Sequence, residues 1–303
     1  MARFGREPVH AVQIGAFDSE RREVPQSGHG GRWGGATEEA DGRAMKVTSW
    51  GVFTDCGMVR RVNEDAYLAA PPMFVVADGM GGHAAGEVAS HLAVEVLSEL
   101  VGRGPIGVQD VIDAVDTAND AIVQTAEANS ITAGMGTTLT GIAQVMAGGV
   151  EHWMAFNMGD SRVYRLAGDR LEQLTVDHSE VQELITSGEI TREEAGVHSR
   201  RNVVTRSLGT LPASPLDSWV FPPLEGERFL LCSDGLTREV SDDEIAACLR
   251  TGADPVATAE DLLALALGRG GADNVTVIVV DGSDEEVQQT VDEDTMPRGG
   301  HDE

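Results

Sequence analysis

The sequence predicts an α+β protein in which helices cover sheets of antiparallel strands. From Val47 to about Asp281, short runs rich in Val, Ile, Leu and Phe alternate with longer helical patterns, and Gly or Asp marks most transitions. The strands come in clusters rather than in strict alternation with helices, which disfavours a doubly wound parallel sheet. We therefore expect one continuous layered domain over residues 45–282.

Two segments have the period of amphipathic helices, and a third has the pattern of hairpins. In residues 86–101 and 108–129, apolar side chains recur at three- and four-residue spacing over several turns, which is typical of helices that cover a sheet. Residues 152–175 instead contain strands joined by short Gly-Asp turns at 159–160 and 168–169. These hairpins predict antiparallel pairing.

Both ends of the chain have compositions typical of unstructured segments. Residues 1–44 are rich in Gly, Arg, Glu and Ser and lack a helical or strand period, so we expect a disordered leader. Because Met45 opens the first patterned segment, we hypothesise that it is the natural start residue. Residues 283–303 are acidic and poor in apolar side chains, which predicts a disordered tail. This tail has no dimerisation pattern, so we expect a monomer.

Composition and charge exclude several classes of function. Of 303 residues, 41% are hydrophobic, and 50 acidic against 22 basic side chains give a formal net charge of -28. This charge argues against binding to nucleic acid or to an anionic membrane, because both need clustered Lys and Arg. The sequence has no apolar run of 18 residues and no export-signal pattern, and its three scattered cysteines lack CxxC spacing. We therefore expect a soluble cytoplasmic protein.

Four aspartates stand next to Gly or Asn at the borders of apolar runs, namely Asp78, Asp160, Asp234 and Asp273. A strand that ends in Asp-Gly brings a carboxylate to the edge of a sheet, and several such edges together form an oxygen-rich pocket. Carboxylate oxygens suit Mg²⁺ and Mn²⁺ better than zinc or copper. The pattern therefore predicts metal-assisted chemistry. Asp281 also follows an apolar run, but we interpret it as a turn residue.

Seven segments stand in a fixed order along the chain, namely RRVNEDAY at 60–67, VVADGMGGHAAGEVAS at 75–90, GMGTTLTG at 134–141, NMGDSRVY at 157–164, LTVDHSEV at 174–181, LCSDGLTREVSDDEI at 231–245 and GADNVTVIVV at 271–280. Together they resemble the metal-dependent protein phosphatase family, the PPM or type 2C class of Ser/Thr phosphatases, in its bacterial form. The resemblance implies a four-layer αββα sandwich, with two central antiparallel sheets flanked by helices and a binuclear Mn²⁺ or Mg²⁺ centre at one end. It also implies a flap at about 179–209.

The resemblance assigns metal ligands to residues of this chain. Asp78 would bridge the two ions, the backbone carbonyl of Gly79 would bind the first, and Asp234 and Asp273 would complete the second. Two hard cations that share a carboxylate can lower the pKa of a shared water and present it for attack on a phosphoester. Glycine at position 79 lets the backbone approach the ions without a β-carbon in the way.

Further acidic residues have supporting roles in this resemblance. Glu64 and Asp65 would act on metal-bound waters rather than as direct ligands. Asp160 would hold, together with Asp234, a third and weaker ion whose occupancy the sequence leaves open. The predicted cofactors are therefore two Mn²⁺ or Mg²⁺ ions, with room for a third.

Two further residues match catalytic positions of the family. Arg60, four residues before Glu64, matches the phosphate-binding arginine, whose planar guanidinium can clamp two phosphoryl oxygens; Arg61 is the alternative. His83 matches the histidine proposed as general acid for the leaving alkoxide, and its alternative is a surface loop histidine. The flap is rich in arginines that either recognise phosphoprotein or pair with neighbours such as Glu193 and Glu194; these are Arg192, Arg200, Arg201 and Arg206.

These features predict a protein Ser/Thr phosphatase that hydrolyses phosphoserine and phosphothreonine with metal-activated water and without a phosphoenzyme. Its partners would be phosphorylated proteins and an opposing Ser/Thr kinase. One alternative is a catalytically silent pseudophosphatase that signals by binding, which the intact set of Asp78, Asp234, Asp273 and Arg60 disfavours. The other is a phosphatase of a stress-switch regulatory protein, which the lack of an appended sensor region in residues 1–44 disfavours.

Overall fold

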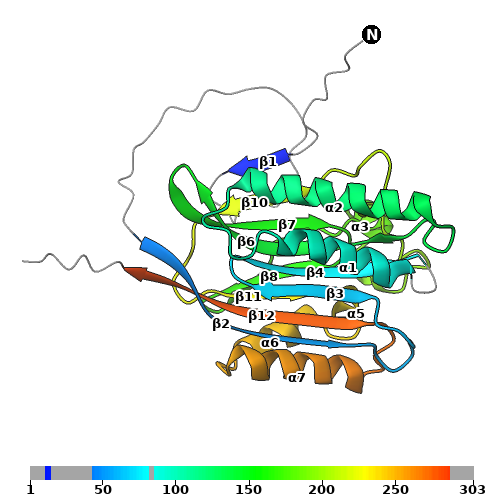
Figure 1. Ribbon diagram of the computed structural model, residues 1–303. Helices are drawn as coiled ribbons and strands as arrows, with labels where there is room; N and C mark the ends of the chain where they lie inside the picture. The colour runs from blue at the N-terminus through cyan, green and yellow to red at the C-terminus, as the bar shows by residue number, and fades with distance from the viewer. Residues whose placement is uncertain (1–10, 15–42, 82–84, 287–303) are drawn as a thin grey trace, which may run out of the picture.

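Two stacked β-sheets with helices on both outer faces form the protein, as the ribbon diagram shows (Figure 1). The computed structural model describes residues 11–14, 43–81 and 85–286. Within these ranges the four layers confirm the predicted αββα sandwich. The antiparallel hairpin of β8 (Arg162–Ala167) and β9 (Arg170–Gln173) confirms the pairing predicted around Gly168-Asp169. The hairpin predicted at Gly159-Asp160 was wrong, because this turn leads from β7 (Val150–Met158) in one sheet to β8 in the other.

The first sheet has seven strands in the described part of the chain, in the order β1-β10-β7-β6-β4-β3, and its seventh strand, β5, pairs with β4. All of these pairs are antiparallel except the parallel pair of β1 and β10, which the prediction of purely antiparallel sheets did not include. The remaining strands of this sheet are β1 (Ala11–Ile14), β3 (Asp65–Ala70), β4 (Met73–Met80), β5 (Gly136–Thr137), β6 (Leu139–Ala147) and β10 (Asp217–Phe221).

The second sheet has five strands in the described ranges, in the order β2-β12-β11-β8-β9, and every pair is antiparallel. Its centre is apolar on both faces because one face packs on the first sheet and the other on helices, which explains the continuous apolar run VIVV at 277–280. The strands not yet given are β2 (Arg43–Asp55), β11 (Arg228–Cys232) and β12 (Val275–Glu286).

Helices cover the outer faces of both sheets. The predicted amphipathic segments form α1 (Ala85–Ser98) and α2 (Val108–Ala128) on the first sheet, while α6 (Asp242–Leu249) and α7 (Pro255–Gly268) cover the second (Figure 1). Helix α7 begins after Asp254, whose side chain accepts hydrogen bonds from the N–H groups of Val256 and Ala257. No helix in the described ranges has the length and apolar content needed to cross a membrane.

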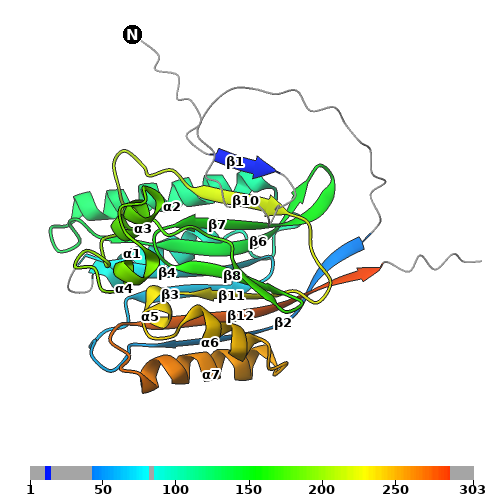
Figure 2. The same ribbon diagram turned by 180° about the vertical axis from the view of Figure 1, so that it is seen from behind.

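Three short helices lie at one end of the sandwich. They are α3 (Glu180–Thr186), α4 (Arg192–Gly196) and α5 (Asp234–Thr237), and Figure 2 labels all three at the same end. Helices α3 and α4 belong to the segment predicted as the flap. Because α5 follows directly on β11, the residue that begins it, Asp234, lies at the edge of the second sheet.

The core between the two sheets fixes how they stack. Trp153, Phe74 and Phe229 are fully buried there, and the rings of Trp153 and Phe229 pack edge to face with centroids 4.9 Å apart. The indole N–H of Trp153 donates to Glu227 Oε1 at 2.6 Å, so its polar edge is also bonded. Burial of each such side chain stabilises the fold by about 1.5–3 kcal/mol. This packing therefore fixes the positions of the strand ends of the two sheets relative to one another.

The structure differs from the sequence prediction near both ends of the chain. Strand β1 lies within residues 1–44, for which no ordered structure was predicted, and β2 begins at Arg43. Strand β12 continues to Glu286, four residues beyond the predicted end at 282, because its last residues pair with the start of β2. Main-chain hydrogen bonds in a ladder do not depend on apolar side chains, so composition alone missed this extension.

Asp281 was predicted to be a turn residue, and this prediction was wrong. It lies inside β12, next to an irregularity in the pairing with β2 between Asp281 and Gly282. Its carboxylate accepts hydrogen bonds from Nε and Nη2 of Arg228 at 2.6 and 2.9 Å. The residue is thus a structural ion-pair partner that lies outside the cavity described below.

Candidate metal centre

A cavity of about 520 Å³ lies where the ends of β4, β11 and β12 meet. Antiparallel pairing explains the meeting point, since β3 begins opposite the end of β4 and β12 begins opposite the end of β11. Residues far apart in the sequence therefore line one cavity. The predicted site residues among them are Arg60, Glu64, Asp78, Gly79, Asp160, Asp234 and Asp273. His83 lies outside the described residues.

Asp65 connects the two sheets beneath this cavity. It stands directly opposite Asp78 in the β3–β4 pair, and its Oδ2 accepts hydrogen bonds from the hydroxyls of Ser233 at 2.8 Å and Thr276 at 2.7 Å. Its Oδ1 is buried without a hydrogen-bond partner among the described residues. Burial raises the pKa of Asp65 to about 6 even though the two hydroxyls favour the charged form.

The backbone of Asp78 is held by two threonines. Its N–H donates to Thr138 Oγ1 at 3.0 Å, and its carbonyl accepts from Thr138 N–H and from the Thr137 hydroxyl, both at 2.9 Å. Thr138 also lines the cavity and shares a 2.8 Å hydrogen bond with the hydroxyl of Ser161. The sequence analysis quoted both threonines within a motif but assigned them no role. The two threonines thus fix the backbone of Asp78, from which its carboxylate extends.

Gly79 is needed for a close approach of backbone to backbone. A β-carbon here would collide with the carbonyl oxygen of Gly86 at the start of α1 and would lie 2.6 Å from that of Glu64. The N–H of Gly79 donates to the same Glu64 carbonyl at 3.1 Å. The sequence analysis attributed the glycine to an approach to the ions. In the structure, position 79 requires glycine because α1 and the segment that contains Glu64 pack closely against β4.

The carboxylates of the cavity repel one another. Burial first, and then the nearby Asp65 and Asp234, raise the pKa of Asp78 well above its usual value. Burial, and then Asp160, raise that of Asp234 in the same way, whereas burial and Asp177 raise the pKa of Asp160 to about 6. Such mutual repulsion is relieved when a cation enters the cluster.

Two arginines bind the carboxylates at the mouth of the cavity. Nε of Arg60 lies 2.8 Å from Asp273 Oδ1, its Nη2 donates to Oδ2 at 2.9 Å, and Nη1 of Arg238 donates to the same Oδ2 at 2.6 Å. Arg238 also pairs with Asp234. No three His, Cys, Asp or Glu side chains of the described ranges surround a common point at which they could hold an ion. The guanidinium groups hold Asp234 and Asp273 in this arrangement.

The residues of the cavity nevertheless fit hard divalent cations. All candidate ligands are carboxylate or carbonyl oxygens, which Mg²⁺ and Mn²⁺ prefer. Oδ1 of Asp234, like Oδ1 of Asp65, is buried and has no hydrogen-bond partner in the described part of the chain. A buried carboxylate oxygen without a donor is costly unless something else satisfies it. A cation in the cavity would give these oxygens a partner and would relieve the repulsion among the aspartates.

Asn274, next to Asp273, ties the arginine-bearing loop to the site. Its Nδ2 donates to the carbonyls of Cys56 and Val62 at 3.0 and 2.9 Å, and its Oδ1 accepts from Glu64 N–H at 2.9 Å. The loop that contains Arg60 is therefore anchored at both ends by one side chain. The sequence analysis did not identify this role, because nothing in the local sequence GADNV indicates which backbone carbonyls accept hydrogen bonds from the Asn274 side chain.

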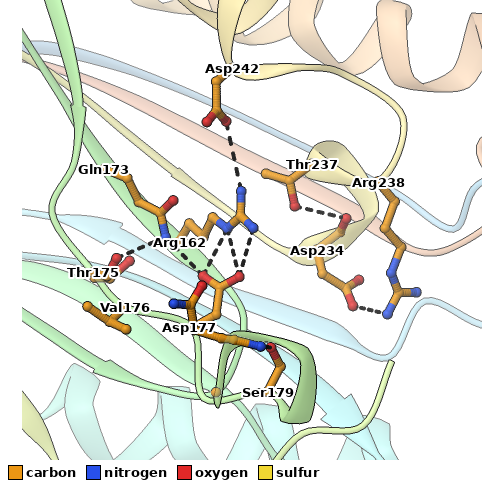
Figure 3. A network of polar contacts seen from close by, with 12 residues as sticks. Arg162, Gln173, Thr175, Val176, Asp177, Ser179, Asp234, Thr237, Arg238 and Asp242 are labelled. Atoms are coloured by element: carbon orange, nitrogen blue, oxygen red, sulfur yellow. Dashed lines mark hydrogen bonds and ion pairs between the residues drawn. The ribbon is translucent and has the colours of Figure 1, made fainter. Parts of the chain in front are cut away.

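A partly buried network surrounds Arg162, two residues after Asp160 (Figure 3). Arg162 donates to Asp177 through Nε at 2.9 Å and Nη2 at 2.7 Å, and through Nη1 to the Tyr164 hydroxyl at 2.8 Å. The Tyr164 hydroxyl donates in turn to Asp242 Oδ1 at 2.9 Å. The network thereby joins β8 to the segment before α3 and to helix α6.

Replacement of Arg162 by leucine is expected to destabilise the protein by about 3–5 kcal/mol, because it leaves Asp177 largely buried without its ion-pair partner. Urea unfolding followed by circular dichroism measures this change. The matched control is Arg103→Ala, which removes an exposed pair with Glu99 and should cost less than about 1 kcal/mol. Equal losses in the two variants would contradict the structural role of the network.

His178 joins the turn that contains Asp160 to the base of the flap. Gly159 N–H donates to its Nδ1 at 3.1 Å, so Nε2 carries the proton and donates to Asp217 Oδ2 at 3.0 Å. The His178 N–H donates back to the Gly159 carbonyl at 2.8 Å. The sequence analysis gave His178 no role, although it lies within the quoted motif LTVDHSEV. Its contacts are made with residues that the motif does not contain.

The flap forms one wall of the cavity through Asn202 and Val204. Two of its four arginines have ion-pair partners that the sequence analysis did not name. Arg200 pairs with Glu180, and Arg206 Nη1 donates to Asp217 Oδ1 at 2.9 Å. Within the described ranges, no ion pair joins these arginines to Glu193 or Glu194, the neighbours that were expected as partners. The Glu194 carboxylate instead accepts a hydrogen bond from the backbone N–H of Thr191 at the start of α4.

The αββα sandwich and the cavity at its end are those of the metal-dependent protein phosphatases. The profile of the family described as protein phosphatase 2C matches residues 60–266. The chain is 40% identical over 255 residues to the serine/threonine protein phosphatase PstP of Mycobacterium tuberculosis, covering 82% of this chain and 48% of PstP. It is 39% identical over 242 residues to the serine/threonine phosphatase stp of Listeria innocua, covering 75% of this chain and 93% of stp.

Solved structures agree with this relationship. The catalytic domain of PstP in complex with two manganese ions superposes with a TM-score of 0.73 at 39% identity, covering 80% of this chain and 100% of that domain. The phosphatase MsPP from Mycobacterium smegmatis, in complex with cacodylate, superposes with a TM-score of 0.70 at 36% identity, covering 78% of this chain and 98% of MsPP. The chain belongs to the protein phosphatase 2C family. It spans about half of the length of full PstP.

Proposed function

We propose that the chain is a protein Ser/Thr phosphatase that hydrolyses phosphoserine and phosphothreonine monoesters with the help of two Mn²⁺ or Mg²⁺ ions. One observation carries this proposal. The cavity gathers the carboxylates of Asp78, Asp234 and Asp273 next to an exposed guanidinium, that of Arg60. Membership of the protein phosphatase 2C family supports the same activity. A single cluster of hard ligands beside a phosphate-binding group suits phosphoester hydrolysis better than binding alone.

The site residues would have different roles in this reaction. Asp78, the carbonyl of Gly79, Asp234 and Asp273 would hold the cations, which supply an activated water for attack on phosphorus. Glu64 and Asp65 would orient water molecules. Asp65 is suited to this because the hydroxyls of Ser233 and Thr276 hold one oxygen and leave the other without a partner.

Arg60 would bind the phosphoryl group. Its side chain is 52% exposed at the mouth of the cavity and already makes a two-point contact with a carboxylate, the geometry that a guanidinium also uses for phosphate. A phosphoprotein would therefore meet Arg60 before it reaches the buried aspartates. We also propose His83 as the general acid that protonates the leaving alkoxide; support for this role comes from its position in the DGMGGH motif.

The partners that follow from this activity are phosphorylated proteins and an opposing Ser/Thr kinase. We propose a cytoplasmic monomer, in keeping with the three free cysteines, Cys56, Cys232 and Cys248, of which Cys232 is buried. The net charge of -28 disfavours nucleic acid and anionic membranes as partners. The same negative charge would make the cations and Arg60 the main attraction for a phosphorylated side chain.

Removal of metal is expected to abolish hydrolysis of a phosphothreonine peptide by the full chain. Treatment with EDTA should stop release of inorganic phosphate, and added Mn²⁺ should restore it, because the aspartates by themselves repel a phosphate dianion. Phosphate release at each stage is the measurement. A folded protein that releases no phosphate with either Mn²⁺ or Mg²⁺ would contradict the proposed activity and favour the pseudophosphatase.

A further inference from the structure

His178 is a buried histidine in the motif LTVDHSEV, and the proposed reaction does not use it. Its side chain is 5% exposed, and it directly precedes the flap at about 179–209. Two separate segments contribute to the cavity wall, the turn that contains Asp160 and the flap, through Asn202 and Val204. The hydrogen bonds of His178 reach both segments.

On the side of the turn, His178 and Gly159 bond to each other twice. The Gly159 N–H donates to Nδ1 of His178 at 3.1 Å, and the His178 N–H donates to the Gly159 carbonyl at 2.8 Å. Gly159 has a φ of 118°, which favours glycine, and a β-carbon there would lie 2.6 Å from the side chain of Thr138. The turn is thus held between Thr138 and His178, and its next residue is Asp160.

On the side of the flap, the backbone of His178 helps to join the two ends of this segment. Its carbonyl accepts a hydrogen bond from Thr205 N–H at 2.8 Å, and the Glu180 N–H donates to the Val203 carbonyl at 2.9 Å. Val204, which lines the cavity, lies between the two residues of the flap end that make these bonds. The flap wall is therefore fixed directly at His178.

The side chain of His178 reinforces this closure through Asp217, the first residue of β10. Nε2 of His178 donates to Asp217 Oδ2 at 3.0 Å, while Oδ1 of Asp217 accepts from Arg206 Nη1 at 2.9 Å. One carboxylate thus binds the residue before the flap and a residue near its end. Because β10 belongs to the first sheet, this carboxylate anchors both of them to a regular element of the fold.

We propose that His178 is a positioning residue that fixes the flap relative to the Gly159–Asp160 turn and thereby shapes the part of the cavity that binds a phosphoprotein. The inference rests on the proposed function and specifies which residue controls its substrate-binding wall. A phosphopeptide would contact the flap as well as the cations and Arg60, whereas a small ester such as p-nitrophenyl phosphate would need only the latter. Displacement of the flap should therefore weaken peptide binding selectively.

Substitution of His178 in the full chain tests this inference, because the contacts of its two ring nitrogens can be removed separately. Asparagine offers an amide oxygen near Nδ1 for the Gly159 N–H but no donor near Nε2 for Asp217. For His178→Asn we expect the KM of a phosphothreonine peptide to rise about tenfold, in keeping with one lost hydrogen bond, while KM and kcat for p-nitrophenyl phosphate change by less than about twofold. Backbone amides of residues 180–205 should exchange with deuterium about tenfold faster, as measured by mass spectrometry without metal or substrate.

His178→Gln makes the opposite change, since its longer amide reaches toward Asp217 and leaves the Gly159 N–H without its acceptor. Exchange should then become faster at residues 157–161 and stay near the native rate in the flap. The matched control is His152→Asn, at a histidine of β7 whose ring contacts the Val150 carbonyl outside the cavity. This control should change neither the kinetics nor the exchange.

Native values of both peptide KM and flap exchange in folded His178→Asn would overturn the inference, as would an equal rise in KM for both substrates. Faster flap exchange with an unchanged peptide KM would overturn it too. If His178→Asn does not fold, Arg206→Met removes the other contact of Asp217 from a partly exposed side chain and should show the same selectivity by a smaller factor. A native peptide KM in that variant would then overturn the inference.

Failure of the proposed function has a different signature. In that case the native protein hydrolyses neither substrate with Mn²⁺ or Mg²⁺. The exchange rates of the flap and of the turn need no turnover, so they still decide whether His178 positions these two segments.

Discussion

Replacement of Asp78 by asparagine is expected to lower kcat for a phosphothreonine peptide by about 10³-fold, equivalent to about 4 kcal/mol of transition-state stabilisation. Asp78 would bridge both cations, and asparagine offers one neutral oxygen where two ions need a shared charge. Asp78 lines the cavity and its backbone is held by Thr138 on both sides, so the exchange of one oxygen for an amide should leave the fold intact. Steady-state phosphate release at saturating Mn²⁺ measures the loss.

Stability separates this catalytic loss from a folding defect. The charge of Asp78 is unfavourable in the metal-free protein, because burial and the neighbouring carboxylates raise its pKa. The free energy of unfolding of metal-free Asp78→Asn should therefore stay the same or rise by about 1 kcal/mol. The matched control, Asp281→Asn, removes a charge that binds Arg228 and should show the opposite pattern of lower stability and normal kcat. An Asp78 variant with more than a tenth of native kcat would disprove the bridging role.

Replacement of Arg60 by alanine is expected to lower kcat/KM for the same peptide by about 10²–10³-fold, because a two-point guanidinium contact with the phosphoryl group is lost. The inhibition constant of inorganic phosphate should rise in parallel, since it reports phosphate binding without turnover. Arg60→Lys should recover only part of the loss, because an ammonium keeps the charge but not the planar pair of donors. Kinetics at several peptide concentrations separate kcat from KM.

Arg61 provides the control for this prediction. It lines the same cavity but makes none of the hydrogen bonds to Asp273 that Arg60 makes. Arg61→Ala should therefore change kcat/KM by no more than a few fold. If instead the Arg61 variant lost more activity than the Arg60 variant, the phosphate-binding role would belong to Arg61, the alternative that the sequence left open.

Local patterns predicted the parts of the molecule that depend on neighbouring residues. The helical period of residues 108–129 predicted α2, because one buried stripe recurs every three to four residues. The aspartates at strand ends predicted the cavity, because strand edges of a sheet meet in space. The order of the seven motifs then implied the fold, which the sheet topology confirmed.

Contacts between distant segments were not predictable in the same way. Arg238 and Asp273 are 35 residues apart, and His178 and Asp217 are 39 apart; neither pair has a local signal that joins it. The pairing of β1 with β10 belongs to this class as well. Such contacts depend on where whole strands and helices come to lie, and motif spacing does not encode that position.

The sequence by itself determined the layered fold class, the acidic oxygen-rich character of the site and the identity of most of its candidate ligands. Periodicity and strand-end aspartates are properties of neighbouring residues, and both remain visible without coordinates. Only the tertiary structure decided which arginines form ion pairs with those carboxylates. Arg60 pairs with Asp273, and Arg238 pairs with both Asp234 and Asp273. Electrostatic interactions depend on distance in space, and the stacking of the two sheets sets that distance.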